Sequence, residues 1–119
     1  MEMFKKKNIY EGLNLLDLKP VRTFEFVIQD DYKVTLLIPK FRDKILGKYL
    51  QPIIKKKFFK VKLDTLGSFV WLNCDGQTTV RELAEKLKKQ FGDAAEPADE
   101  RVARFIQQLY RGDCITFNI

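Results

Sequence analysis

The chain has 119 residues, of which 45% are hydrophobic and ten are phenylalanine, so a single domain of this size can bury a core of its own. It contains no histidine, no glycine-rich phosphate loop and no GxSxG motif, which removes the commonest general base and metal ligand and argues against an independent enzyme. The net charge of +6 is concentrated in residues 1–62, with 15 Lys and Arg against 7 Asp and Glu, whereas residues 63–119 carry 7 against 9. We therefore expect no catalytic residue, no metal site and no cofactor, and an anionic partner should be attracted mainly by the first half.

Residues 1–20 are expected to be an N-terminal extension, followed by one domain over residues 21–119. Glu11 and Asp17 interrupt the apolar stretch that a signal peptide would need. The longest apolar runs also fall far short of the ~20 residues that cross a membrane as a helix. These features indicate a cytoplasmic protein without a transmembrane segment.

Alternating apolar residues predict a β-hairpin, with strands at 24–28 and 33–38 and an aspartate-containing turn at 29–32. The residues that would share a face are Phe24, Phe26 and Ile28 in the first strand and, toward the core, Val34, Leu36 and Ile38 in the second. A third strand is predicted at 58–63. It places Phe59, Val61 and Leu63 on one face and Lys60 and Lys62 on the other, a pattern that suits an edge strand.

The segment 40–57 is predicted to be a basic amphipathic insertion between the second and third strands. Its apolar residues recur at helical spacing, although Gly47 and Pro52 weaken or kink a helix there. One interpretation is a short helix packed on its own domain. The other is a surface that docks on a membrane or a partner, which requires those apolar residues to be exposed.

Three helices are predicted in the second half. Asp64 can cap a helix over 65–73 with Leu66, Phe69 and Val70 facing inward and Leu72 as a further candidate. Thr79 and Glu82 form a capping box that begins a helix ending at Gly92. A last helix, 98–111, precedes a short closing strand. The expected fold is α+β and winged-helix-like: a three-stranded antiparallel sheet, three helices and a C-terminal wing strand.

Unusual residues are concentrated between the third strand and the second helix. Trp71 is the only tryptophan, and Cys74 and Cys114 are lone thiols without metal-ligand spacing. No partner for catalysis lies near them in the sequence, and the Asp75-Gly76 pair is typical of a turn. We therefore expect both cysteines to be small buried side chains and Trp71 to belong to the scaffold rather than to an active site.

The ordered pattern Leu63-Asp64, Gly67, Trp71, Cys74-Asp75-Gly76, Thr79-Val80 and Leu83 resembles the coenzyme PQQ synthesis protein D (PqqD) family over roughly residues 58–117. The resemblance implies a non-catalytic peptide chaperone, a recognition element for ribosomally made and modified peptides. Such a protein binds a precursor or leader peptide and presents it to a modifying enzyme of the radical-SAM or another class. PQQ itself is not expected to bind.

The resemblance also implies a binding mode, in which the peptide pairs with the edge of the third strand and lies in a groove against the last helix. The candidate peptide-binding residues are then Phe58, Phe59, Lys60, Val61 and Lys62 on the strand and Arg101, Arg104, Phe105, Gln108 and Arg111 on the helix. Their charges suit an acidic leader peptide. The alternative is that both elements present ordinary solvated faces.

A winged-helix DNA-binding protein, with helix 98–111 as its recognition helix, is the main alternative function. Two features argue against nucleic acid as the partner. The connection Gly92–Pro97 is longer than the short turn of a helix-turn-helix motif. The start of the helix is also crowded by carboxylates where phosphates would approach, namely Asp93, Glu96, Asp99 and Glu100.

Overall fold

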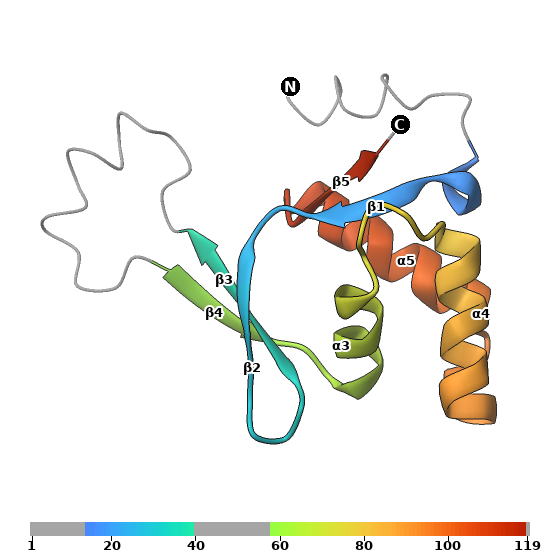
Figure 1. Ribbon diagram of the computed structural model, residues 1–119, viewed down its shortest axis with the longest axis horizontal. Coiled ribbons are helices and arrows are strands. Elements are labelled where there is room, and N and C mark those ends of the chain that lie inside the picture. Colours follow the sequence, from blue (N-terminus) through green and yellow to red (C-terminus); the bar gives the residue numbers. More distant parts are fainter. Residues whose placement is uncertain (1–13, 40–57, 119) are drawn as a thin grey trace, which may run out of the picture. The chain divides into compact units, whose positions relative to one another are not determined.

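The computed structural model describes residues 14–39 and 58–118, shown as coloured ribbon in Figure 1. The predicted insertion at 40–57 lies outside the described residues. Its two interpretations, a packed helix and a docking surface, therefore stay predictions. The chain divides into two compact units. We call Phe24–Ser68 the sheet unit, and Met1–Thr23 together with Phe69–Ile119 the helical unit.

The sheet unit contains the predicted three-stranded antiparallel sheet, in the order β2-β3-β4. Its strands are β2 (Glu25–Ile28), β3 (Val34–Pro39) and β4 (Phe58–Lys62). The central strand carries the core residues, since Val34 and Leu36 are almost completely buried. The chain turns between β2 and β3 at Gln29–Lys33, where the Gln29 N–H donates to Lys33 O at 2.9 Å. The predicted hairpin and third strand are therefore confirmed.

The first predicted helix is α3 (Thr65–Leu72), which continues from the sheet unit into the helical unit. Asp64 caps it as expected, because the Gly67 N–H donates to Asp64 Oδ1 at 2.7 Å. One inward position was wrong: Leu72 is 38% exposed, whereas Trp71 is fully buried. The last turn of an eight-residue helix has few neighbours to fix its face, so the apolar spacing alone did not decide between them.

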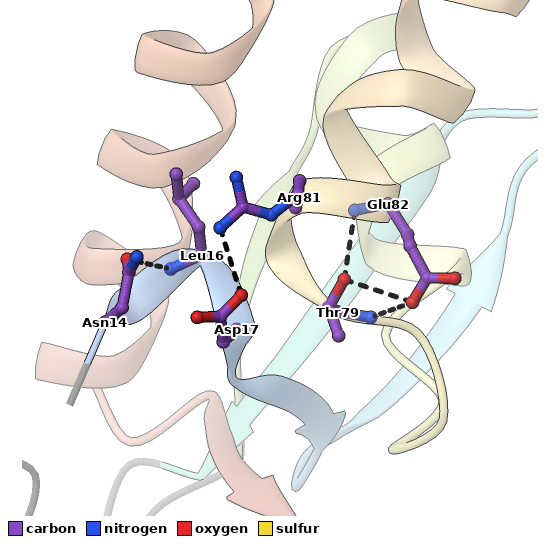
Figure 2. Close-up of polar contacts among 6 residues, drawn as sticks. All are labelled: Asn14, Leu16, Asp17, Thr79, Arg81 and Glu82. Carbon is purple, nitrogen blue, oxygen red and sulfur yellow. Dashed lines mark hydrogen bonds and ion pairs between the residues drawn. The ribbon is translucent and has the colours of Figure 1, made fainter.

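The helical unit packs α4 (Val80–Phe91) beside α5 (Ala98–Arg111), with the 3-10 turn η3 (Gly92–Ala95) between them in the sequence (Figure 1). The capping box is present, with the Glu82 N–H donating to Thr79 Oγ1 at 3.1 Å and the Thr79 N–H to Glu82 Oε1 at 2.9 Å (Figure 2). The core residues include Trp71, Cys74, Val80, Leu83, Leu87, Val102, Ile106, Cys114 and Ile115. Both cysteines are thus buried, as predicted, and Trp71 is a buried residue of the scaffold.

A strand that the sequence did not predict lies near the N-terminal end of the described residues. After the turn η1 (Leu15–Asp17), β1 (Lys19–Arg22) pairs antiparallel with β5 (Ile115–Asn118), the predicted closing strand. Figure 1 shows β1 and β5 side by side. The segment was missed because it is short and contains Pro20, so it has no alternation of its own.

Further contacts fasten this N-terminal segment to the start of α4. The Val80 N–H donates to Leu18 O at 3.0 Å, and Asp17 forms an exposed ion pair with Arg81 at 3.0 Å (Figure 2). The Gly76 N–H donates to Pro20 O at 2.9 Å. In the described parts of the chain, every helix falls short of the length and apolarity that a membrane crossing requires.

Candidate functional site

The strand β4 lies at one edge of the sheet. Among the described strands it pairs only with β3, so its other side faces no other strand of the described residues. All five of its residues are exposed. Three of them are large and apolar, with exposed fractions of 37% for Phe58, 56% for Phe59 and 40% for Val61. An edge strand with exposed apolar side chains is a surface on which another chain can pair.

The hydrogen-bonding pattern decides which backbone groups of β4 face the open edge. The Leu63 N–H donates to Val34 O at 2.8 Å, and Lys62 is the register partner of Thr35. Consecutive residues of an antiparallel strand direct their N–H and C=O groups alternately to the two sides. Phe59 and Val61 therefore direct theirs to β3. The residues that direct theirs to the open edge are Phe58, Lys60 and Lys62.

The side chains of β4 divide between the two faces of the sheet as predicted. Phe59 and Val61 are the partners of Ile38 and Leu36, on the face that carries the buried core of β3. Lys60 and Lys62 are the partners of Leu37 and Thr35 on the opposite face. The edge thus offers apolar contacts on one face and, on the other, the two lysines together with Phe58.

The two lysines differ in their surroundings. Lys62 Nζ contacts Asp31 Oδ2 at 2.8 Å, and both side chains are about half exposed. The hydrogen bond from Lys62 is the main cause that lowers the pKa of Asp31 below 3.8, with a further contribution from the Lys33 N–H. Lys60 makes no ion pair or side-chain hydrogen bond with the rest of the described chain. This difference was not predicted, because the sequence pattern indicates only that Asp31 belongs to the turn.

The second candidate set lies on α5, and its predicted polar stripe is present. We call Arg101, Arg104, Gln108 and Arg111 the α5 stripe; all are exposed, and the neighbouring Phe105 is half-buried. Arg101 is already engaged, because its Nη1 donates to Ala94 O at 2.8 Å. Arg104 and Arg111 are the guanidinium groups that remain available to a partner in this part of the chain.

The predicted site residues thus form two sets, one on β4 in the sheet unit and one on α5 in the helical unit. Within each set the structure brings the residues together on one element. Their role in binding a peptide remains a prediction.

The Cys74 thiol is unsuited to nucleophilic chemistry. Burial raises the pKa of Cys74 to about 12, although the nearby Arg22 partly opposes this effect. A thiol with such a pKa carries almost no thiolate at neutral pH. Within residues 14–39 and 58–118, no group of His, Cys, Asp or Glu side chains is arranged to hold a metal ion.

Comparison with known proteins places part of the chain in a family. Residues 58–115 match the family model described as Coenzyme PQQ synthesis protein D (PqqD). The match begins with the first residue of β4 and ends with the first residue of β5, so it includes both candidate elements. No curated protein and no solved structure gives a significant match. The segment of residues 58–115 belongs to the coenzyme PQQ synthesis protein D (PqqD) family.

Proposed function

We propose that this chain is a non-catalytic peptide-binding protein. It receives a ribosomal precursor or leader peptide as an added strand at the open edge of β4 and presents it, in the cytoplasm, to a modifying enzyme of the radical-SAM or another class. Family membership supports a peptide-binding role associated with PQQ synthesis in coarse terms. The strand pairing and the class of enzyme are the finer parts of the proposal.

The observation that carries the proposal is the open edge of β4. Its outward N–H and C=O groups, on Phe58, Lys60 and Lys62, are the groups that an extended peptide satisfies when it joins a sheet. Main-chain bonds of this kind provide affinity for many sequences, and the side chains beside them provide selectivity. Binding alone then delivers the peptide, because a protein that holds it near an enzyme raises its effective concentration there.

The α5 stripe is proposed as a second contact for an acidic peptide. Arg104 and Arg111 are exposed and available, and guanidinium groups form charge-assisted hydrogen bonds with carboxylates. The same stripe does not favour DNA, since the first turn of α5 carries Asp99 and Glu100, both exposed. Duplex DNA is therefore the control ligand rather than a second candidate partner.

The first test is a titration with a dye-labelled leader peptide encoded beside this chain, with random duplex DNA as the control. We expect saturable binding of the peptide only. Hydrogen exchange of the unaltered protein then locates the peptide: the Lys60 and Lys62 amides should exchange more slowly in the complex, while the exposed amides of the β2–β3 turn should not change. Steeply salt-dependent binding of DNA alone would overturn the proposal.

A matched pair of variants tests the strand addition itself. Lys60→Pro removes an N–H that faces the open edge, a position at which an edge strand tolerates proline, and Lys60→Thr removes the same charge but keeps the N–H. Loss of one main-chain hydrogen bond, about 0.5–1.5 kcal/mol, should weaken peptide binding by Lys60→Pro relative to Lys60→Thr. Val61→Pro would not serve, because its N–H faces β3. Equal affinities of the two Lys60 variants would contradict the assignment.

A further inference from the structure

We infer that the β4 edge selects an extended peptide in which one acidic residue lies between two apolar residues, and that Asp31 restricts the peptide to this pattern by holding Lys62. The inference rests on the proposed function, because it requires a peptide strand beside β4. It adds the chemical class of that peptide and a residue that determines its charge.

The pattern follows from the order of side chains at the centre of β4. Phe59, Lys60 and Val61 alternate between the two faces of the sheet. A residue of an added strand that lies across from Lys60 places its side chain on the lysine face, and its two neighbours place theirs on the face of Phe59 and Val61. The order apolar–acidic–apolar is therefore complementary. It reads the same in both directions, so it holds for a parallel or an antiparallel peptide.

Lys62 does not favour a second acidic residue in the peptide. Its ammonium group contacts Asp31 Oδ2 at 2.8 Å, while the other carboxylate oxygen, Oδ1, accepts the Lys33 N–H at 3.0 Å. Asp31 is thus held by its own turn and placed against β4. A peptide carboxylate near Lys62 would have to displace it or lie beside a like charge, which costs as much as the new ion pair contributes.

Lys60 is the lysine whose charge is left for the peptide. It lies across from Leu37, which offers no carboxylate, and it makes no ion pair within the described residues. Its backbone N–H and C=O also face the open edge, so a peptide residue across from it can share main-chain hydrogen bonds and an ion pair at the same position. Selectivity for an acid should therefore be concentrated at Lys60.

The test uses the full chain and short dye-labelled synthetic peptides of threonine with a central valine–glutamate–valine segment. A second peptide replaces the glutamate by glutamine. Two further peptides keep the glutamate and add a second one two positions away, one on the N-terminal side and one on the C-terminal side. Anisotropy titrations compare the wild-type chain with Lys60→Met, Lys62→Met and Asp31→Asn. The methionine variants keep the unbranched stem and the backbone N–H while removing the charge, and all three changes are at exposed positions.

We expect the glutamine peptide to bind the wild-type chain about two- to fivefold more weakly than the glutamate peptide, as for an exposed cross-strand ion pair. This difference should vanish in Lys60→Met and persist in Lys62→Met. The second glutamate, on the side of Lys62, should improve affinity by a similar factor only in Asp31→Asn.

Four results would count against the inference. A glutamate–glutamine difference that survives Lys60→Met would remove the role of Lys60, and an unchanged response of Asp31→Asn to the second glutamate would remove that of Asp31. Saturable binding of the glutamate and glutamine peptides with equal affinity would reject the charge pattern while leaving the proposed function intact. Absence of binding to every peptide, including the encoded leader, would reject both.

Discussion

The hydroxyl group of Ser68 accepts a hydrogen bond from the backbone N–H of Val34 at 2.8 Å, in the buried part of the sheet unit. The alternation of β3 and β4 would direct this N–H to Leu63 O. Ser68 Oγ lies between the two groups and donates to Leu63 O at 3.4 Å. The first turn of α3 thus supplies the side chain that completes the pairing of β3 where β4 ends.

Replacing Ser68 by alanine should therefore destabilise the protein, because the buried N–H of Val34 would lose its acceptor. The cost of an unsatisfied buried donor is about 1–3 kcal/mol. The free energy of unfolding from urea titrations measures it. Thr65→Ala, at an exposed position of the same helix, is the control and should change the stability much less. Equal stabilities of the two variants would show that Val34 finds another acceptor.

Much of the fold was predictable because its signals are local. The Thr79–Glu82 capping box, the cap at Asp64 and the alternation of β3 each depend on residues a few positions apart. The strand β1 was not predictable in this way. It exists because it pairs with β5, almost a whole chain length away, and its own sequence contains a proline.

In the candidate site, too, the features with local sequence signals were predicted, and those that depend on contacts with other segments were not. The edge position of β4 and the two faces of its side chains follow from alternation and were predicted. Which lysine is available depends on how the Asp31 turn lies against β4, and which N–H groups face outward depends on the pairing register with β3. Neither fact is encoded within the strand itself.

A side chain at Gly76, in the Asp75-Gly76 turn, should destabilise the protein. Its φ is +78°, a conformation that costs an L-residue about 1–2 kcal/mol. Gly76→Ala should lower the free energy of unfolding by about this amount. Gly112 has a negative φ, and an added Cβ there would meet its nearest atom at an ordinary 3.5 Å, so Gly112→Ala should be nearly neutral. Chemical denaturation of both variants checks the difference, and a neutral Gly76→Ala would contradict it.

Asp75 should make the stability depend on pH in the acid range. Its carboxylate accepts the N–H groups of Gln77 and Thr78 at 2.9 and 3.0 Å, and the bond from Gln77 is the main cause that lowers its pKa below 3.8. Because the folded-state pKa is lower than the unfolded one, the unfolded state binds the proton first. The contribution of Asp75 is complete above the unfolded pKa and is lost as the pH falls through the folded pKa.

Urea titrations between about pH 6 and pH 2.5 measure this contribution. Asp75→Asn should lower the stability at neutral pH and flatten its fall toward acid. Asp93→Asn, which removes an exposed carboxylate from η3 in the same unit, is the matched control. A wild-type chain and an Asp75→Asn variant with parallel pH profiles would rule out the carboxylate as the source.

Arg101 and Arg104 lie one turn apart on α5, yet they should affect different properties. Arg101 fastens η3 through its bond to Ala94 O at 2.8 Å, whereas Arg104 is exposed and makes no such bond among the described residues. Arg101→Ala should lower the free energy of unfolding, by no more than about 1 kcal/mol for an exposed bond. Arg104→Ala should leave it unchanged.

In peptide titrations, Arg104→Ala should have a larger effect than Arg101→Ala. Arg104→Ala should weaken the binding of an acidic leader peptide by about two- to fivefold at low salt, as expected for an exposed ion pair, and Arg104→Glu should weaken it further because it places like charges together. Both differences should shrink as salt is added. A salt-independent loss, or no loss with Arg104→Glu, would mean that the α5 stripe does not contact the peptide and that the affinity comes from β4 alone.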